Sequence, residues 1–422
     1  MEKIIIKGGC KLSGEINLSA AKNAVLPIIA ASILPSDTCI IEGAPMLEDV
    51  SVLCDVLKSL NADVVINKEL EEISIDSKNI FNTDANSELI RKMRASFLIM
   101  GPMLSRFGHF RVSLPGGCNI GSRPIDLHLK GFKALGADIY MDHGFVEAKA
   151  DKLVGSEIYL DFPSVGATEN IMMAAVLAEG ETILENSAEE PEIKDLANYL
   201  ISMGADIEGA GTDTIRIRGV KKLKGTKYRP IFDRIEAGTF MIAGAITNSC
   251  ITINGAEEEY LRPVIAKLTE CGVNMDINEK SITIKGYNEL KAIDIKTMPY
   301  PGFPTDMQAQ MIALLCLTPG TSIVTETVFE NRFMHAAELK RMGANIKIDG
   351  RSAIIEGVPK ITGSEVNATD LRAGAALVLA GLAAEGVTEI GDIYHIDRGY
   401  VRIEEKLKGL GANIERINKW FV

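Results

Sequence analysis

The sequence predicts an α/β protein of two domains, each built from three copies of one repeated unit. One observation is a helix end that recurs along the chain, in which an apolar stretch closes on Gly, once on Asn. Gly is typical of a helix end because the residue there adopts a positive φ. The six closing residues, separated by 75, 68, 68, 71 and 68 positions, are Asn61, Gly136, Gly204, Gly272, Gly343 and Gly411.

A second observation is one helix per unit that is apolar nearly all round and is therefore expected to be buried on every side. These helices are expected at 24–34, 95–104, 167–177, 237–246, 307–317 and 373–384. A turn and a strand follow each of them, as at 180–184, and alternating apolar residues after each recurring helix end predict further strands. Each unit therefore reads as buried helix, strand, loop, amphipathic helix, strand and strand.

Units of this length are too small to be stable alone, so three are expected to pool around their buried helices in each domain. Repeats one to three and four to six would form the two halves, and residues 227–234 are a plausible crossing between them. A continuous solenoid is the alternative, which central helices buried on all sides disfavour.

The composition excludes several classes of protein. Among 422 residues, 46% are hydrophobic and 24% charged, and no apolar run reaches the roughly 18 residues of a membrane span, so a soluble protein is expected. The N-terminus lacks the features of a secretory signal, which predicts a cytoplasmic location. A net charge of −12 disfavours a nucleic-acid partner. Seven widely spaced cysteines, without a CxxC pair or a Cys/His cluster, predict no disulfide framework and no zinc site, and neither a metal nor a cofactor is expected.

Polar and charged residues gather where the buried helices begin. Thr305-Asp306 and Thr369-Asp370 could be plain N-caps. Lys22, Arg94 and Arg372 oppose the helix dipole, however, and a bound anion is the obvious explanation. Loops at equivalent points of repeats two, five and six add three arginines, which are Arg123, Arg332 and Arg398. The sequence therefore predicts a shared anion site.

One cysteine stands in a setting that favours reactivity. Cys118 lies among glycines, with Arg123 five residues on, and a nearby cation favours the thiolate. Cys10 also follows paired glycines, but it lies between strand-like runs at 3–7 and 11–16 and is expected in a hairpin. The other five cysteines have apolar or helical settings, where Cys behaves as a small hydrophobe. Spacing alone leaves the reactivity of Cys118 open.

Seven motifs together resemble the UDP-N-acetylglucosamine 1-carboxyvinyltransferase family, the enolpyruvyl transferases that open peptidoglycan synthesis. The similarity spans essentially the whole chain. The motifs are Lys22-Asn23-Ala-Val-Leu-Pro, Arg94-Ala-Ser, Leu-Pro-Gly-Gly-Cys118-Asn-Ile-Gly-Ser-Arg123-Pro-Ile-Asp126-Leu-His, Ser164-Val-Gly-Ala-Thr, Phe-Pro-Thr-Asp306-Met-Gln-Ala-Gln, Glu-Asn-Arg332-Phe and Asp397-Arg398-Gly.

The resemblance implies a fold and a reaction. The fold is an inside-out α/β barrel of two domains with three βαβαββ units each, one at 21–230 and the other at 231–422 completed by residues 1–20. The reaction moves the enolpyruvyl group of phosphoenolpyruvate to the 3′-hydroxyl of UDP-N-acetylglucosamine, through a tetrahedral ketal, with release of phosphate. It is the first committed step of peptidoglycan synthesis.

The resemblance also implies residue roles. Cys118 would protonate the methylene carbon of phosphoenolpyruvate and can form a covalent adduct, and Asp306 would take the proton of the sugar hydroxyl. Lys22, Arg123 and Arg398 would hold the phosphate, with Lys22 and Arg398 counted among the catalytic groups. Arg332 and Arg372 would bind the carboxylate or balance developing charge. The remaining substrate contacts would be Asn23, Arg94, Arg123, Pro124, Ile125, Asp126, Leu127, Ser164, Val165, Gly166, Asp306, Val328 and Asp370.

Two features of the resemblance carry their own expectations. Some family members have a lysine just before Ser-Val-Gly, where this chain has Phe162-Pro163, so the contact to the diphosphate there is open. The glycines of the loop 115–121 indicate a lid that closes over the substrates.

Two alternatives compete with this interpretation. A shikimate 3-phosphate enolpyruvyl transferase would share the six repeats but has no need of Cys118 or of the run 123–126. A non-catalytic sugar-nucleotide-binding scaffold would have no use for Cys118, Asp306 and the loop arginines. The expected partners are therefore the two small-molecule substrates, without nucleic acid or membrane, and the sequence does not indicate an oligomeric state.

Overall fold

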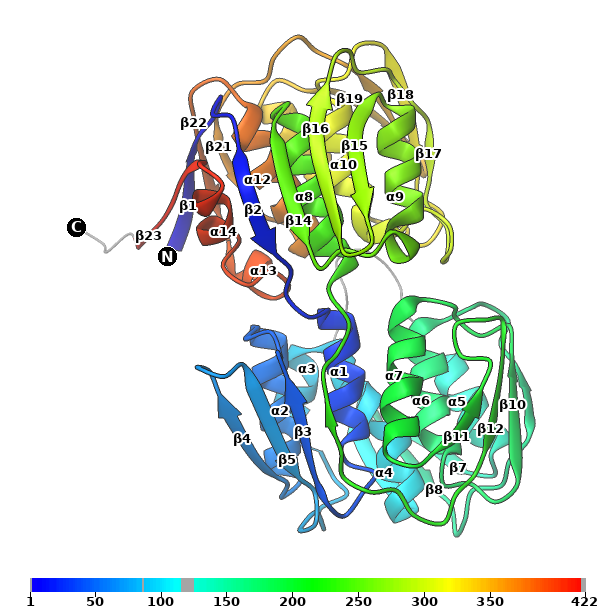
Figure 1. Ribbon diagram of the computed structural model, residues 1–422. Helices are drawn as coiled ribbons and strands as arrows, with labels where there is room; N and C mark the ends of the chain where they lie inside the picture. Colours follow the sequence, from blue (N-terminus) through cyan, green and yellow to red (C-terminus); the bar gives the residue numbers. More distant parts are fainter. Residues whose placement is uncertain (1, 86, 115–124, 419–422) are drawn as a thin grey trace. The chain divides into compact units, whose positions relative to one another are not determined.

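The computed structural model describes residues 2–85, 87–114 and 125–418, which fold into two compact units. The C-terminal unit contains 2–19 and 232–418, and the N-terminal unit contains 20–114 and 125–231, except residue 86. Figure 1 shows the helices and strands of both units. In the described part of the chain, no helix is both long and apolar enough to cross a membrane.

The C-terminal unit has three sheets of four strands. Their orders are β21-β22-β1-β23, β15-β16-β14-β2 and β17-β18-β20-β19. The strands are β1 (Glu2–Lys7), β2 (Ser13–Asn17), β14 (Cys250–Asn254), β15 (Val273–Asn278), β16 (Ser281–Tyr287), β17 (Ile295–Lys296), β18 (Thr321–Thr325), β19 (Asn345–Asp349), β20 (Ser352–Glu356), β21 (Glu365–Asn367), β22 (Val387–Gly391) and β23 (Asn413–Asn418).

The N-terminal unit also has three sheets. Their orders are β13-β3-β5-β4, β6-β8-β7 and β11-β12-β10-β9. The strands are β3 (Thr38–Glu42), β4 (Asp63–Asn67), β5 (Glu72–Asp76), β6 (His109–Ser113), β7 (Asp138–Asp142), β8 (Phe145–Lys149), β9 (Glu157–Tyr159), β10 (Glu181–Glu185), β11 (Asp206–Glu208), β12 (Thr214–Arg218) and β13 (Lys227–Tyr228).

The sheets repeat one pairing pattern, which confirms the six predicted units. In each four-stranded sheet one edge strand runs parallel to its neighbour and the other pairs are antiparallel, as in β2 with β14, β14 with β16 and β16 with β15. The sheet of β6, β7 and β8 has only antiparallel pairs, and an isolated parallel bridge between Asp84 and Arg111 takes the place of its fourth strand.

Helices fill the inside of each unit, and the sheets cover them from outside (Figure 1). In the C-terminal unit α8 (Arg234–Ile246), α10 (Gln308–Leu315) and α12 (Leu371–Ala383) pack against one another, and nearly all their residues are buried. In the N-terminal unit, most residues of α1 (Lys22–Ala31), α4 (Met100–Phe107) and α6 (Val165–Ala175) are likewise buried. The predicted α/β class with buried central helices is confirmed.

Two of the central helices begin differently from the prediction. The stretch expected as one helix at 95–104 is a 3₁₀ turn, η1 (Arg94–Ile99), followed by α4. Gly101 and Pro102 explain the change, because the Gly101 N–H donates to the Asn170 side chain and Pro102 has no N–H to donate. Likewise η2 (Thr305–Met307) precedes α10.

Amphipathic helices complete the repeats, each with one face toward the core. They are α2 (Glu48–Ser59), α5 (Asp126–Ala134), α7 (Pro191–Ser202), α9 (Glu258–Glu270), α11 (His335–Arg341) and α14 (Ile403–Gly409), with the shorter α3 (Ser87–Lys92) and α13 (Tyr394–Asp397).

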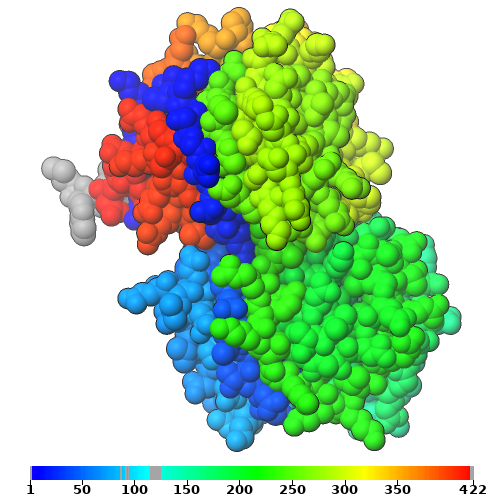
Figure 2. Space-filling view, viewed as in Figure 1, coloured from blue at the N-terminus to red at the C-terminus, as the bar shows by residue number. Residues whose placement is uncertain are grey.

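The N-terminal residues build two different sheets of the C-terminal unit. Strand β1 lies between β22 and β23, and β2 is the parallel edge partner of β14. Figure 2 shows these blue residues between the red C-terminal segment and the green repeat four. The expectation of a hairpin around Cys10 is therefore wrong, because β1 and β2 do not pair with each other.

Candidate active site

Three predicted site residues of the C-terminal unit meet at one carboxylate. Asp306 in η2 accepts hydrogen bonds from Arg332, at 2.6 Å between Nη2 and Oδ1, and from Arg372, at 3.0 Å between Nη2 and Oδ2. The two arginine side chains are 4% exposed and that of Asp306 is 25% exposed. Arg332 follows β18 and Arg372 lies in the first turn of α12, so segments far apart in the sequence supply the three charges.

The charges around Asp306 control its protonation. Burial alone would raise the pKa of the Asp306 carboxyl, but Arg372 and Arg332 outweigh burial and hold that pKa well below its usual range. Burial would lower the pKa of Arg372, and the Asp306 carboxylate raises it instead. The carboxylate is therefore ionised, and a quarter of its side chain stays accessible to act as a proton acceptor.

Aromatic rings lie against both arginines. The Arg332 guanidinium lies 5.2 Å from the ring centre of Phe329, and that of Arg372 lies 5.6 Å from the ring centre of Tyr400. An aromatic ring attracts a cation that lies over its face, so these contacts restrict the two guanidinium groups to few orientations.

Asp370 acts in the structure as the N-cap of α12. Its Oδ1 accepts hydrogen bonds from the backbone N–H groups of Arg372, at 2.9 Å, and of Ala373, at 3.0 Å. The cap interpretation of this residue is therefore confirmed, and the cap also fixes the backbone of Arg372. Nearby, burial and Arg332 lower the pKa of His335 to about 4, although Asp370 opposes them, so this imidazole is neutral at pH 7.

The other two predicted residues of this unit lie in loops beside these helices. Val328 is in the turn after β18, where its N–H donates to the Glu326 carboxylate at 2.8 Å. Arg398 is the C-cap residue of α13, next to Asp397, which accepts hydrogen bonds from Arg416 at 2.5 and 3.0 Å.

In the N-terminal unit Lys22 is held by a carboxylate that sequence reasoning missed. Lys22 opens α1, and its Nζ lies 2.6 Å from Oδ2 of Asp49 in α2, with both side chains almost fully buried. The positive charge that opposes the dipole of α1 is thus compensated within the chain. Asn23, the next residue, is exposed. No signal in the sequence singled out Asp49, because an Asp in the first turn of a helix is common.

The starts of α5 and α6 lie together in the same unit. Ser164 caps α6 by accepting a hydrogen bond from Ala167 N at 3.4 Å. A Cβ on Gly166 would come 3.3 Å from the His128 ring, so Gly allows α5 and α6 to approach closely. The fully buried Asn170 joins them, with its Nδ2 3.0 Å from His128 Nδ1 and 3.0 Å from Phe97 O. The predicted residues Ile125, Asp126 and Leu127 lie at the start of α5 and Ser164, Val165 and Gly166 at the start of α6, so the approach of His128 to Gly166 links the two predicted runs.

Several predicted residues are not described by the structure. Cys118, Arg123 and Pro124 lie outside the described residues, as does the lid predicted at 115–121. For Arg94 the structure describes the backbone at the start of η1 but not the side chain. In the described part of the chain no group of three or more His, Cys, Asp and Glu side chains could hold a metal ion.

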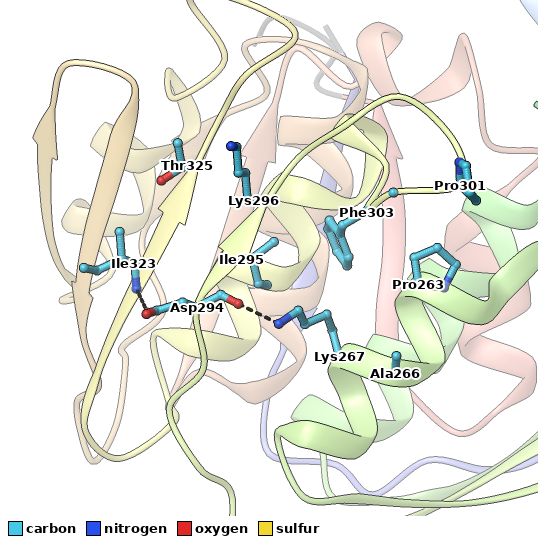
Figure 3. Close-up of a pocket in the computed structure, with 11 residues that line it drawn as sticks. Pro263, Ala266, Lys267, Asp294, Ile295, Lys296, Pro301, Phe303, Ile323 and Thr325 are labelled. Carbon is cyan, nitrogen blue, oxygen red and sulfur yellow. Dashed lines mark hydrogen bonds between the residues drawn. The ribbon is translucent and has the colours of Figure 1, made fainter. Parts of the chain in front are cut away.

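The C-terminal unit contains a cavity of about 480 Å³ (Figure 3). It is bordered by α9, by the segment 294–303 and by β18, and none of its lining residues is a predicted site residue. Two of its charged residues are paired with each other or with the backbone, since Lys267 Nζ donates to Asp294 O at 2.8 Å and Ile323 N donates to Asp294 Oδ1 at 2.9 Å. We therefore place no chemistry in it.

Comparison with known proteins gives matches over nearly the whole chain. The family model described as EPSP synthase (3-phosphoshikimate 1-carboxyvinyltransferase) matches residues 6–407. UDP-N-acetylglucosamine 1-carboxyvinyltransferase 2 of Clostridium tetani is 68% identical over 99% of this chain and 100% of its own length. UDP-N-acetylglucosamine 1-carboxyvinyltransferase 1 of Staphylococcus aureus is 56% identical over the same shares.

Solved structures agree with the fold. The enolpyruvyl transferase NikO from Streptomyces tendae matches with a TM-score of 0.89 and 26% identity, covering 98% of both chains. An EPSP synthase of Acinetobacter baumannii matches with a TM-score of 0.77 and 20% identity over 99% of this chain and 100% of its own, a likeness of fold alone. The resemblance inferred from the motifs is confirmed, and the chain belongs to the EPSP synthase family and, within it, to the UDP-N-acetylglucosamine 1-carboxyvinyltransferases.

Proposed function

We propose that this chain transfers the enolpyruvyl group of phosphoenolpyruvate to the 3′-hydroxyl of UDP-N-acetylglucosamine and so supplies the precursor of peptidoglycan. The full-length identity of 68% to a relative that carries this activity in its name supports the assignment most directly. The ionised Asp306 between two buried arginines is the geometric feature that fits it, because the reaction needs a proton acceptor beside cations.

The chemistry divides between addition and elimination. In the addition the sugar 3′-oxygen bonds to C2 of phosphoenolpyruvate, its proton passes to the Asp306 carboxylate, and the Cys118 thiol protonates C3. In the elimination the thiolate left on Cys118 takes a proton back from C3, the bond from C2 to the phosphate oxygen breaks, and the proton on Asp306 passes to the released phosphate, which yields the enolpyruvyl ether and phosphate. Although burial opposes it, Arg372 and Arg332 keep Asp306 in the ionised form, which is the form that can accept this proton.

The cations bind the charged donor. Arg332 and Arg372 hold the carboxylate of phosphoenolpyruvate or balance charge near Asp306, while Lys22, Arg123 and Arg398 hold its phosphate. One pair of opposite charges 4 Å apart contributes about 4 kcal/mol at an effective dielectric of 20, before desolvation. Several converging cations are therefore needed to bind a triply charged donor.

The sugar nucleotide is bound by the remaining predicted residues. In the N-terminal unit the helix starts at Asp126 and at Ser164 present backbone N–H groups and a partial positive charge, which suit the diphosphate. Just before Ser164 this chain has Phe162-Pro163, so no lysine side chain adds to these N–H groups at that point. Asn23, Arg94 and Val328 complete the set.

A direct assay tests the assignment. The purified protein is incubated with phosphoenolpyruvate and UDP-N-acetylglucosamine, and phosphate release is followed together with the product mass. We expect an enolpyruvyl sugar nucleotide and one phosphate per product. Shikimate 3-phosphate in place of the sugar nucleotide is expected to give no product. A protein that releases no enolpyruvyl product with UDP-N-acetylglucosamine would contradict the proposal.

The role of Cys118 predicts a site of covalent labelling. Fosfomycin is an epoxide that a thiolate opens, so we expect it to add its mass to the peptide that contains Cys118 and to no other. The Cys118→Ala variant is expected to lose this labelling, as peptide mass spectrometry would show. Cys250, which is exposed, and Cys10, which is half-buried, serve as internal controls. Labelling of Cys10 instead of Cys118 would refute the choice of thiol.

A further inference from the structure

We propose that Glu326 and Thr305 are positioning residues for Asp306, since they orient the Arg332 guanidinium that contacts it. The inference rests on the proposed function, in which Asp306 is the proton acceptor. Thr305 lies in the motif around Asp306, but neither residue is among the catalytic and substrate-binding residues that the resemblance implies. Their contribution follows from a chain of hydrogen bonds that begins at a buried carboxylate and ends at Asp306.

Glu326 is a carboxylate with four donors around it. It is 1% exposed and lies just after β18. Its Oε1 accepts hydrogen bonds from Thr297 Oγ1 at 2.8 Å, from Val328 N at 2.8 Å and from Phe329 N at 3.2 Å. Its Oε2 accepts one from Thr305 Oγ1 at 2.8 Å. An ionised carboxylate only accepts hydrogen bonds, so these four neighbours fit the ionised form and compensate its burial.

The Thr305 hydroxyl has a single proton, which determines the direction of its hydrogen bonds to Glu326 and Arg332. A hydroxyl has one proton to donate, and Glu326 can only accept, so the Thr305 proton points to Glu326. The lone pairs of Thr305 Oγ1 are then left for Arg332 Nη1, which donates to it at 3.0 Å. The other terminal nitrogen of the same guanidinium, Nη2, donates to Asp306 Oδ1 at 2.6 Å.

Arg332 depends on this contact for its orientation. Its Nε is buried without a hydrogen-bond partner, so within the described residues Thr305 and Asp306 receive the hydrogen bonds of this guanidinium. Glu326 also fixes the backbone of Phe329, whose ring lies 5.2 Å from the guanidinium. The buried Glu326 carboxylate thus holds both the Thr305 hydroxyl, which accepts a hydrogen bond from Arg332, and the backbone of Phe329, whose ring lies beside Arg332.

The groups that face Asp306 come from several elements. Arg332 follows β18, and Arg372 lies in α12. Burial would lower the pKa of Arg372, and Tyr400 and Asp233 join Asp306 in raising it. Burial lowers the pKa of His335 in α11, and the charges of Asp370 and Arg332 also act on it. Among these groups, Arg332 is the one whose placement depends on Glu326 and Thr305.

The inference predicts a change in the titration of Asp306. Thr305→Val keeps the shape of the side chain but removes the acceptor of Arg332, and Glu326→Gln puts an NH₂ group among four donors. Each change loosens Arg332, so less positive charge stays beside Asp306 and its pKa rises. We expect a rise of about 3 pH units, the upper end of the shift that an adjacent opposite charge gives a carboxyl, which brings the titration of Asp306 into the pH range in which the chain stays folded. The acid limb of the pH profile of kcat is expected to move to higher pH with it.

Carbon-13 NMR of the Asp306 carboxyl in the full chain measures this without substrate, and Asp306→Asn assigns the signal. Wild type is expected to stay ionised to the lowest pH at which it remains folded. Thr297→Val is the matched control, since it removes a hydrogen bond to the same Glu326 carboxylate on the side away from Asp306. Thr305→Ser keeps the hydroxyl and is expected to titrate as wild type does.

Two results would overturn the inference: an Asp306 titration in Thr305→Val equal to that of wild type, or an equal shift in Thr297→Val, which would indicate general loosening. If Glu326→Gln does not fold, Thr305→Val carries the test. The product assay with wild-type protein separates this outcome from a failure of the proposed function, because the NMR titration does not depend on turnover.

Discussion

Asp306→Asn is expected to reduce kcat by a factor on the order of 10²–10⁴, the usual contribution of a positioned general base. The amide keeps the shape of the side chain but cannot take the proton of the sugar hydroxyl. Because Arg332 and Arg372 already hold the carboxylate at 2.6 and 3.0 Å, the variant changes its charge more than its position. Steady-state kinetics with both substrates measure the effect.

The same variant is expected to lower the free energy of unfolding by about 3–5 kcal/mol, because it leaves two buried guanidinium groups without their anion. The folded-state pKa of Asp306 lies below the unfolded value of about 3.9. Its stabilisation is therefore complete above that pH and is lost as the pH falls through the folded-state pKa. The difference between wild type and variant should be largest near neutral pH and shrink below about pH 4.

Glu385→Gln is a matched control for this prediction. Glu385 pairs with Lys360 at 2.8 Å, but both side chains are more than 60% exposed, so removing its charge should cost less than about 1 kcal/mol and leave kcat unchanged. Urea unfolding and the product assay, applied to both variants, make the comparison. An Asp306→Asn variant with kcat within a factor of ten of wild type would contradict the role of this carboxylate as base.

The repeated helix ends could be predicted from the sequence because their cause is local. Each recurring Gly or Asn occupies the left-handed region that a helix stop requires, and this is what the pattern of apolar residues and Gly predicts. Their φ values are 73° at Asn61, 95° at Gly136, 105° at Gly204, 98° at Gly272, 96° at Gly343 and 95° at Gly411. The buried central helices were predictable for the same reason, since a helix without a polar face is stable in a folded protein only when it is buried on all sides.

Contacts between distant segments could not be predicted in this way. Two short apolar strands around a Gly pair have the pattern of a hairpin, and nothing local shows that β1 pairs with β22 and β23 instead. Cations at the helix starts predicted a bound anion, and that anion stays a prediction. For Lys22 and Arg372, however, the structure supplies carboxylates of the chain itself, Asp49 and Asp306, and motif reasoning gave no hint of Asp49 or Glu326. The roles assigned to Cys118 and Arg123 stay predictions.

The largest losses of stability outside the site are expected at two equivalent glycines, Gly219 in the N-terminal unit and Gly357 in the C-terminal unit. Each directly follows a strand, β12 or β20, and donates its N–H to the carbonyl of Gly180 or Gly320, at 3.0 and 2.9 Å. A Cβ on Gly219 would lie 1.6 Å from Ala178 O, and one on Gly357 would lie 1.7 Å from Thr318 O.

A backbone carbonyl cannot rotate away as a side chain can. Gly219→Ala must therefore displace the backbone at Ala178, after α6, and Gly357→Ala must displace the backbone at Thr318, after α10. We expect each to lower the free energy of unfolding by about 3 kcal/mol, the upper part of the usual range for overpacking. Hydrogen exchange should localise the loss of protection, to the sheet of β10 and β12 in the first variant and to that of β18 and β20 in the second.

Gly409→Ala separates this steric effect from the general effect of replacing Gly. Gly409 ends α14, and a Cβ there would meet no heavy atom within 4 Å, so the added methyl group should leave stability unchanged or raise it by up to about 1 kcal/mol through helix propensity. If all three variants unfolded at the same urea concentration as wild type, the close approach between the end of the strand and the end of the central helix would not be required for the stability of the two units. A loss confined to Gly219→Ala and Gly357→Ala would show that one packing rule operates in both units.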